Sequence, residues 1–257
     1  MSALATALTV LGCTLAAALA GLGLRARLPE AHLDGDSRDV VKGVMGLIAT
    51  MAALVLGLLI ASSLSSYNTQ NTGLRKLAAD ILQQDRYLAM YGPETEDLRD
   101  QLRQIVATVH DEIWSPTGVK MEYLTSDKMR DQARQFLVTL VSLSPKTELQ
   151  SFAQKQALQF GEQIGELRAL IADQGGGAER SWLFLVALVF WISVLFLGFG
   201  LVAPFHATNI TAISLGALSV SVAVFVILEL GEPYRGFIQL SDLPMRNVLA
   251  QLGPVRR

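Results

Sequence analysis

Hydrophobic and polar positions follow one another along this chain in long blocks, with two apolar stretches at each end and a polar segment between them. The four apolar runs cover residues 3–24, 43–64, 182–203 and 210–230. No lysine, arginine or aspartate lies inside a run, and the only carboxylate is Glu229, at the end of the last one. A helix needs roughly 20 apolar residues to cross a hydrocarbon layer of about 30 Å, and in lipid it satisfies its own backbone groups. The pattern therefore predicts four transmembrane helices.

The polar middle carries apolar residues at the three- and four-residue spacing of amphipathic helices. Gly92-Pro93 and Pro145 interrupt the pattern, and a loop is expected at residues 115–118. The apolar stripes between these breaks are Leu74, Leu77, Ile81, Leu82 and Leu88; Leu98, Leu102, Ile105, Val106, Val109 and Ile113; Met129, Ala133, Phe136, Leu137 and Leu140; and Leu149, Phe152, Ala153, Phe160, Ile164, Leu167 and Ile171. We predict an all-α integral membrane protein with a cytoplasmic helical bundle between the second and third spans.

These patterns divide the chain into five segments. They are a first pair of spans (1–64), a helical domain (65–174), a glycine-rich linker (175–181), a second pair of spans (182–230) and a C-terminal tail (231–257). Residues 65–72 are polar but contain neither glycine nor proline, so the second span is expected to continue into the domain as one helix. Movement in the domain would then reach the span mechanically.

Composition and charge narrow the function classes. Hydrophobic residues make up 51% of the chain, and its net charge of −2 provides no basic surface for nucleic acid. Cys13 is the only cysteine, which excludes a disulfide within one chain and a cysteine-based metal cluster. The first apolar run has no lysine or arginine before it and is longer than the core of a typical signal peptide, so we expect a retained span.

The location of the middle domain is predicted from the lysines and arginines near the span ends. With four spans, the middle domain and both termini share one side of the membrane. That side carries Arg75, Lys76, Arg168, Arg180, Arg235 and Arg246, and the other carries Arg25, Arg27, Arg38 and Lys42. The larger set favours a cytoplasmic domain, although Arg25 and Arg27 after an uncharged N-terminal segment favour the opposite insertion of the first span.

The second span carries the residues that we single out for function. Small side chains recur at every fourth position (Ala49, Ala53, Gly57, Ala61 and Ser65), beside a stripe of Gly46, Thr50 and Asn68. Small residues let helix backbones approach closely in lipid, so this pattern predicts either helix packing or a pore face around a symmetry axis. The candidate pore-lining residues are Thr50, Ala53, Gly57, Ala61, Ser65 and Asn68.

An uncharged polar collar follows where the second span leaves the membrane. Its members are Ser62, Ser63, Ser65, Ser66, Asn68, Thr69, Gln70 and Asn71. Hydroxyls and amides can replace part of an ion's hydration shell, although such a collar is also expected of a solvated helix end. We place the cytoplasmic mouth or gate at Ser62, Asn71, Glu229 and Glu232.

Other polar groups have ordinary structural explanations. The polar residues of the fourth span, expected to form hydrogen bonds across helices, are Thr208, Asn209, Thr211, Ser214, Ser219 and Ser221. A loose resemblance to a cation site is carried by His32, Asp34, Asp36 and Asp39. This set lacks the glycine and distal glutamate of an EF-hand, and Asp36 or Ser37 is expected to cap the second span.

No set of residues predicts catalysis. His110 lies beside Asp111 on a periodic helix, where a polar helix face is the expected role. The chain has no oriented nucleophile and base, no Walker loop, no zincin helix and no dinucleotide fingerprint. We therefore expect a protein that is not an enzyme and that needs neither a cofactor nor a metal.

Three segments together resemble a known bacterial family. They are VVKGVMGLIAT (40–50) followed by ALVLGLLIA (53–61); Asp80, Asp85-Arg86, Leu88-Ala89 and YGPE (91–94); and Glu229-Leu230, Pro233-Tyr234, Gly236, Ile238, Ser241 and Pro244-Met245-Arg246. This combination is similar to the motifs of the bestrophin-like family, whose domain has no assigned function. The resemblance covers most of the chain and implies a location in the bacterial inner (plasma) membrane.

Bestrophins are pentameric anion channels with four spans per subunit, cytoplasmic helices and a pore lined by the second span. The resemblance therefore implies a homo-oligomer, with a pentamer as the suggested assembly, that conducts small inorganic ions across the bilayer. Bestrophin pores carry bulky aromatic residues, whereas this second span has none before Tyr67, so the ion selectivity stays open. The alternative is a non-conducting sensor or scaffold whose helical domain binds a partner. A small-molecule transporter would show broken helices and internal repeats, which we do not find.

Overall fold

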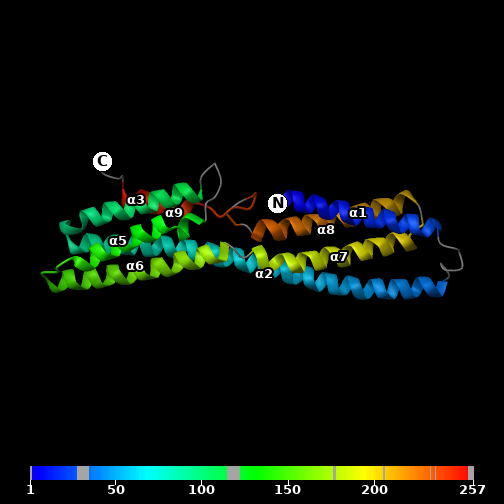
Figure 1. Cartoon of the computed structure of the whole chain (residues 1–257), viewed down its shortest axis with the longest axis horizontal. Coiled ribbons are helices and arrows are strands. Elements are labelled where there is room, and N and C mark those ends of the chain that lie inside the picture. Colours follow the sequence, from blue (N-terminus) through cyan, green and yellow to red (C-terminus); the bar gives the residue numbers. More distant parts are fainter. Residues whose placement is uncertain are drawn as a thin grey trace. The chain divides into compact units, whose positions relative to one another are not determined.

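The computed structural model describes residues 2–27, 35–114, 122–175, 178–204, 206–231, 233–234 and 236–253, and these residues contain helices and no strand (Figure 1). The elements in chain order are α1 (Ala3–Arg27), α2 (Gly35–Tyr91), the 3₁₀ turn η2 (Pro93–Thr95), α3 (Glu96–Ile113), α4 (Glu122–Thr125), α5 (Asp127–Ser142), α6 (Glu148–Gly175), α7 (Ala178–Val202), α8 (Ala207–Gly231) and α9 (Leu243–Leu252). The predicted all-α class is confirmed. The loop expected at 115–118 lies outside the described residues.

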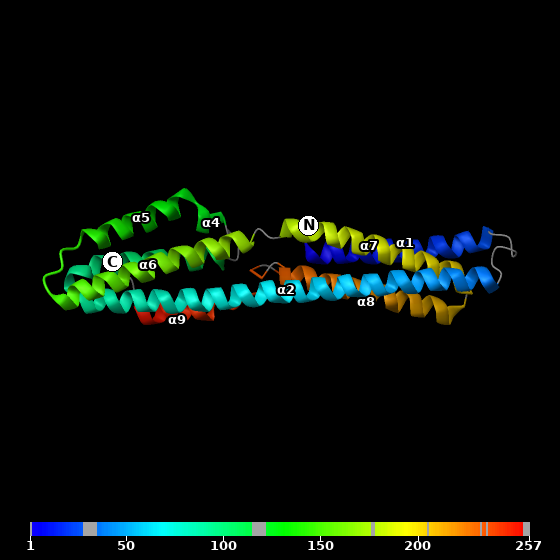
Figure 2. The same cartoon turned by 90° about the horizontal axis from the view of Figure 1, so that it is seen from below.

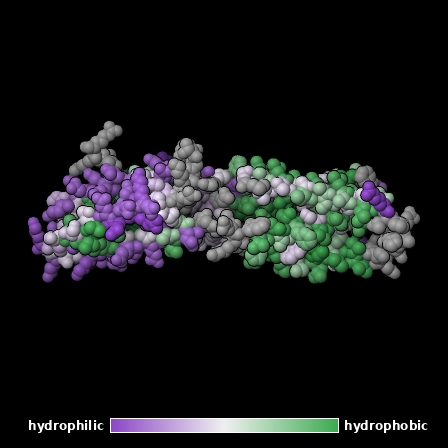
Figure 3. Space-filling view, in the orientation of Figure 1, coloured by the Kyte–Doolittle hydropathy of each residue, from purple (hydrophilic) through white to green (hydrophobic). Residues whose placement is uncertain are grey.

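Four of these helices are long and apolar enough to cross a membrane, which confirms the predicted spans. They are α1, α7, α8 and the apolar part of α2. Figure 3 shows extensive hydrophobic surface over these segments and hydrophilic surface over the helical domain. The chain is therefore a multi-pass membrane protein.

The chain forms two compact units. The membrane unit contains Met1–Ser66 and Ala178–Gly231, and the helical unit contains Tyr67–Gly177 and Glu232–Arg257. Both include part of α2, which is one uninterrupted helix, as the absence of glycine and proline from residues 65–72 predicted (Figure 2).

The membrane unit is held by close approach of helix backbones, with α1 packed on α7 and α8 (Figure 1). A Cβ added at Gly21 of α1 would lie 2.1 Å from the carbonyl oxygen of Leu197, and one at Gly200 of α7 would lie 2.1 Å from that of Ala18. Only glycine fits at such a crossing, because any side chain would meet the opposing backbone. Nearer the N-terminal end of α1, the buried hydroxyl of Ser221 in α8 donates to the Ala7 carbonyl at 2.6 Å.

The helical unit instead has a core of large aliphatic side chains. Its most deeply buried members include Leu88, Leu98, Leu140, Met245 and Val248. The first three come from the amphipathic stripes of α2, α3 and α5, whereas the last two belong to α9, which packs on α3. Burying a large aliphatic side chain contributes about 1.5–3 kcal/mol, so α9 is an integral part of this core.

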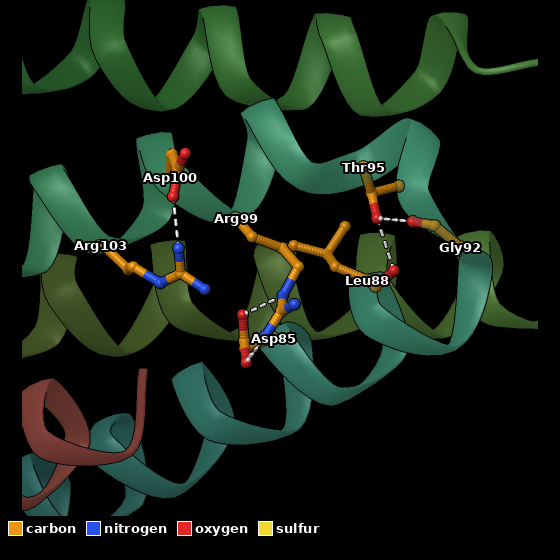
Figure 4. Close-up of polar contacts among 7 residues, drawn as sticks. All are labelled: Asp85, Leu88, Gly92, Thr95, Arg99, Asp100 and Arg103. Atoms are coloured by element: carbon orange, nitrogen blue, oxygen red, sulfur yellow. Dashed lines mark hydrogen bonds and ion pairs between the residues drawn. The ribbon is translucent and has the colours of Figure 1, made fainter. Parts of the chain in front are cut away.

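A sharp turn joins α2 to α3 (Figure 4). Gly92 has φ 127°, a conformation that favours glycine, and Pro93 begins the 3₁₀ turn without needing a backbone donor. The Thr95 hydroxyl donates to the carbonyls of Leu88 at 2.5 Å and Gly92 at 2.8 Å. The YGPE segment is thus a helix-turn signal.

An ion pair fastens the two helices beside this turn. Arg99 of α3 donates from Nε and Nη2 to the two carboxylate oxygens of Asp85 in α2, at 2.7 and 2.9 Å (Figure 4). Two parallel, charge-assisted bonds fix the relative orientation of the helices more firmly than a single contact. Asp85, one of the residues that carry the family resemblance, therefore has a structural role.

The exposed face of the second span

The membrane-spanning part of α2 has one face packed against its own chain and one that is free of it. Met45, Ala52 and Leu59 are buried in a core shared with residues of α7 and α8. They are seven residues apart, which keeps them on one side of a helix of 3.6 residues per turn. All six candidate pore-lining residues are exposed: Thr50, Ala53, Gly57, Ala61, Ser65 and Asn68. These six residues thus face away from the core that α2 shares with α7 and α8, whereas Gly46 and Ala49 of the same stripes line a cavity with residues of α7 and α8.

The glycines of this face are not explained by packing within the chain. A Cβ added at Gly43 or Gly57 would meet no atom within 4 Å apart from the backbone of its own helix turn. This contrasts with Gly21 and Gly200, where the opposing backbone leaves no room. Glycine lowers helix stability by about 0.5–1 kcal/mol relative to alanine, so the exposed glycines suit a contact or an open path that one chain does not provide.

Three polar side chains illustrate the chemistry on and beside this face. The Thr50 hydroxyl donates to the Gly46 carbonyl of its own helix at 2.9 Å, which leaves its oxygen lone pairs available. Asn71, at the predicted mouth, is half-buried and accepts a bond from Arg75 Nε at 3.3 Å. Ser62 is exposed near the same end of the apolar segment. The face offers hydroxyl and amide oxygens and no carboxylate.

The predicted polar collar is wrong at Gln70, which is buried and not solvated. Its side chain is 1% exposed, and neither of its amide atoms has a hydrogen-bond partner in the structure. The collar treated Gln70 as part of a solvated helix end, but this residue falls on the buried side of α2, in line with Ser63 and Ser66, which are half-buried. Composition showed that the segment was polar without showing which side of the helix each residue occupies.

Two carboxylates, Glu229 and Glu232, were predicted to lie at the mouth of the path, and the structure describes only the first of them. Glu229, in the last turns of α8, is 4% exposed and so lies inside the single chain. Glu232 lies outside the described residues. Of the predicted mouth residues, only Ser62 and Asn71 of α2 thus remain as candidates.

The structure also shows the hydrogen bonds made by polar residues of the fourth span. Ser221 makes the hydrogen bond across helices that was expected in the fourth span, whereas Thr211 and Ser219 donate to carbonyls of their own helix.

In the loose cation site considered from the sequence, Asp39 pairs with Lys42 at 2.9 Å. The described residues contain no group of His, Cys, Asp and Glu that could hold a metal ion, and His32 and Asp34 lie outside them. Because α2 begins at Gly35, Asp36 and Ser37 lie within the helix and not at its cap.

Sequence reasoning missed an aromatic cluster in the helical unit. The Trp114 indole Nε1 donates to the Leu240 carbonyl at 3.2 Å, and its ring stacks on His110 with centroids 5.6 Å apart. His110 Nε2 lies 3.5 Å from an Asp242 carboxylate oxygen, so His110 joins α3 to the segment before α9 rather than facing solvent. Burial raises the pKa of the nearby Tyr234 hydroxyl. A helical spacing of Met245, Val248 and Leu252 behind Pro244 was the available signal for α9.

The geometry defines an all-α, multi-pass membrane protein whose second span has one face left uncovered by its own chain. The Bestrophin-like domain matches residues 12–245, which is most of the chain. The chain belongs to the bestrophin-like family. No curated protein and no solved structure matches it.

Proposed function

We propose that this protein assembles as a homo-oligomer in the bilayer and conducts small inorganic ions, with the exposed face of α2 lining the path. The observation that carries the proposal is the exposed stripe from Thr50 to Asn68, which contains small and uncharged polar side chains and whose one glycine, Gly57, has no packing partner in the chain. A ring of such helices would leave room along its axis, since small side chains project little from the backbone. Membership of the bestrophin-like family supports the same class of protein.

The chemistry of this face sets the expected selectivity. Hydroxyls and backbone carbonyls can substitute for water around an ion, and pore width then decides which ions pass. No Asp, Glu, Lys or Arg lies between residues 43 and 74 of α2, so no ring of fixed charge would favour anions or cations. We therefore propose a weakly selective path.

We further propose that the protein lies in the bacterial inner membrane with both termini and the helical unit in the cytoplasm. The lysines and arginines next to the span ends support this orientation. A cysteine replacing the exposed Lys128, in a Cys13→Ala background, tests it. An impermeant thiol reagent should leave intact cells unlabelled and label the residue after lysis, and labelling of intact cells would reverse the orientation.

Reconstitution tests conduction directly. The purified oligomer in planar bilayers under asymmetric salt should carry current, and the reversal potential gives the ion preference. Ser65→Asp places a charge on the exposed face and should move the reversal potential toward cations. Ser63→Asp is the matched control, because Ser63 is half-buried two residues earlier on the packed side. Equal shifts in both variants would remove α2's exposed face from the path.

Oligomers that carry no current under any tested ion, pH or voltage would instead support a non-conducting sensor or scaffold. In that case the helical unit, which has its own core, would be the part that binds a partner. We propose a non-enzymatic role in either case.

A further inference from the structure

A cavity of about 380 Å³ lies inside the helical unit, between α2, α3, α5 and α6. Its walls are mainly apolar and include Leu102 and Ile105 of α3, Phe136 and Leu137 of α5, and Ile164 of α6. Small-molecule sites have volumes of about 300–1,000 Å³ and combine apolar walls with a few polar groups. At the lower end of this range, the cavity has room for one short apolar chain and not for a two-chain lipid.

Two glycines of α6 line the cavity, and they differ in the space around them. A Cβ added at Gly161 would lie 2.9 Å from Gln84 Nε2 and 2.9 Å from Leu137 Cδ2, so a side chain there would require one or both of these side chains to shift. One turn later, a Cβ added at Gly165 would meet no atom within 4 Å. Glycine inside a helix costs stability relative to alanine. The chain therefore keeps space at Gly165 that its own side chains do not fill.

Three arginines line the same cavity: Arg130 and Arg134 of α5 and Arg168 of α6. Arg130 and Arg134 are exposed and mark the side on which the cavity meets solvent, whereas Arg168 is half-buried. Arg130 pairs with the exposed Asp127. Among the described residues, neither Arg134 nor Arg168 has an ion-pair partner, and Arg168 makes only a long contact of 3.5 Å to the Met129 carbonyl.

The electrostatics of this site favour an anion. Burial, and then the positive charge of Arg130, lower the pKa of the Arg168 guanidinium. Like charges held together beside an apolar surface are relieved by a negative group, and among the described residues the chain supplies one only to Arg130, through Asp127. A guanidinium matches a carboxylate with two parallel hydrogen bonds, and such charge-assisted bonds are strong where water is excluded.

We propose that this cavity binds a single-chain amphiphile with an anionic carboxylate head, of the size of a medium-chain fatty acid. The apolar tail lies along the Gly165 face of α6 among the aliphatic walls, and the carboxylate contacts Arg168, with Arg130 and Arg134 beside it. Charge complementarity selects this occupant over a neutral or cationic amphiphile. The inference does not depend on ion conduction.

Thiol protection on the full chain in nanodiscs tests the site without detergent. In a Cys13→Ala background, Gly165→Cys places a thiol on the cavity wall, and Ala169→Cys places one on an exposed position of the same helix. The rate of reaction with a negatively charged thiosulfonate is measured with and without decanoate. We expect decanoate to slow the reaction at position 165 at least fivefold and to leave position 169 unchanged.

Two comparisons separate charge recognition from simple partitioning. Decan-1-ol, which has the same tail and no charge, should protect position 165 much less than decanoate. Decyl phosphate, which has the same tail and a phosphate head, should protect position 165 less than decanoate does. Stronger protection by the phosphate would overturn the carboxylate assignment. Arg168→Gln should raise the decanoate concentration for half-protection about tenfold, whereas Arg86→Gln, an exposed arginine that does not line the cavity, should leave it unchanged.

A second measurement keeps the proposal testable if the cysteine variant does not fold. Saturating decanoate should raise the melting temperature of the parent and of Ala169→Leu, but not of Gly165→Leu, whose side chain fills the cavity. No protection at position 165 together with no shift for the parent would overturn the proposal. Equal protection by decanoate and decan-1-ol would overturn it as well, because the arginines would then have no role.

Discussion

The glycines of the α1–α7 contact and those on the exposed face of α2 are alike in sequence and opposite in environment. At Gly21 and Gly200 an added Cβ would lie 2.1 Å from an opposing carbonyl oxygen. At Gly43 and Gly57 it would meet nothing within 4 Å outside its own helix backbone. The first pair is needed to bring two helices of one chain together. The second pair has no such use within the chain, which is why we assign it to assembly or to a path.

A comparison of the two compact units extends this contrast. The membrane unit relies on close backbone approach, because lipid provides no hydrophobic driving force between apolar helices. The face of the helical unit seen in Figure 3 is mainly hydrophilic, and this unit relies on burial of large side chains, with the Asp85–Arg99 pair beside its main turn. The same change in side-chain size should therefore have different effects in the two units.

The largest effect is expected for Gly200→Leu. The new side chain would force α7 away from α1, and the cost should exceed the ~1–3 kcal/mol typical of an overpacked core, since backbone atoms cannot move aside. Little folded protein should be recovered, as measured by size-exclusion chromatography of the solubilised membrane fraction. Gly23→Leu is the matched control, because a Cβ at this α1 position meets nothing within 4 Å. Normal yields for Gly200→Leu would contradict the close crossing.

The next largest effect is expected in the helical unit for Asp85→Asn. This change removes the charge that holds both Arg99 nitrogens and should lower the free energy of unfolding by about 2 kcal/mol, within the range for hydrogen bonds to charged groups. Thermal unfolding of the purified protein measures it. Asp173→Asn changes an exposed carboxylate of α6 and should have little effect. Similar losses in the two variants would show that the ion pair is not special.

A smaller effect of opposite sign is expected for Asp80→Asn. Asp80 lies in the helical unit beyond the apolar part of α2, is 7% exposed, and has no hydrogen-bond partner for Oδ2. Burial raises its pKa above the ordinary 3.8, against a smaller lowering by Lys76. The raised pKa means that ionisation costs native stability once the pH exceeds the unfolded-state pKa.

The stability penalty of Asp80 is therefore complete only above its raised folded-state pKa, and it disappears below the ordinary value of 3.8, where the carboxyl is protonated in both states. Asp80→Asn should raise the melting temperature at pH 7.5, and the gain should shrink at pH 4. A gain that is larger at pH 4 than at pH 7.5 would show that the carboxylate is stabilised, not destabilised, in the folded protein.

The smallest effect on the stability of the single chain is expected for Gly57→Leu. The exposed position has room for the side chain, so the helices of one protomer should pack as before. Assembly should change instead, because a branched side chain cannot fit where neighbouring backbones approach closely. Native mass spectrometry of the oligomer reports the outcome. If Gly57→Leu assembles and conducts as the parent does, this face of α2 contacts only lipid.

The sequence by itself determined the helices and the class of protein. Runs of apolar residues without charge specify spans wherever they occur, because backbone groups in lipid have no partner except within a helix. The turn at Gly92-Pro93 and the continuity of α2 through residues 65–72 were also predictable, since glycine and proline act locally on backbone conformation.

Only the tertiary structure decided which face of each span is used. Protein interior and lipid are both apolar, so hydrophobic periodicity carries little information about direction inside the membrane. The burial of Gln70 and Glu229, the glycine contacts between α1 and α7, and the exposure of Gly57 all depend on helices that lie far away in the sequence. The cavity beside Gly165 likewise exists only because four separate helices surround it, leaving a space that no stretch of sequence describes.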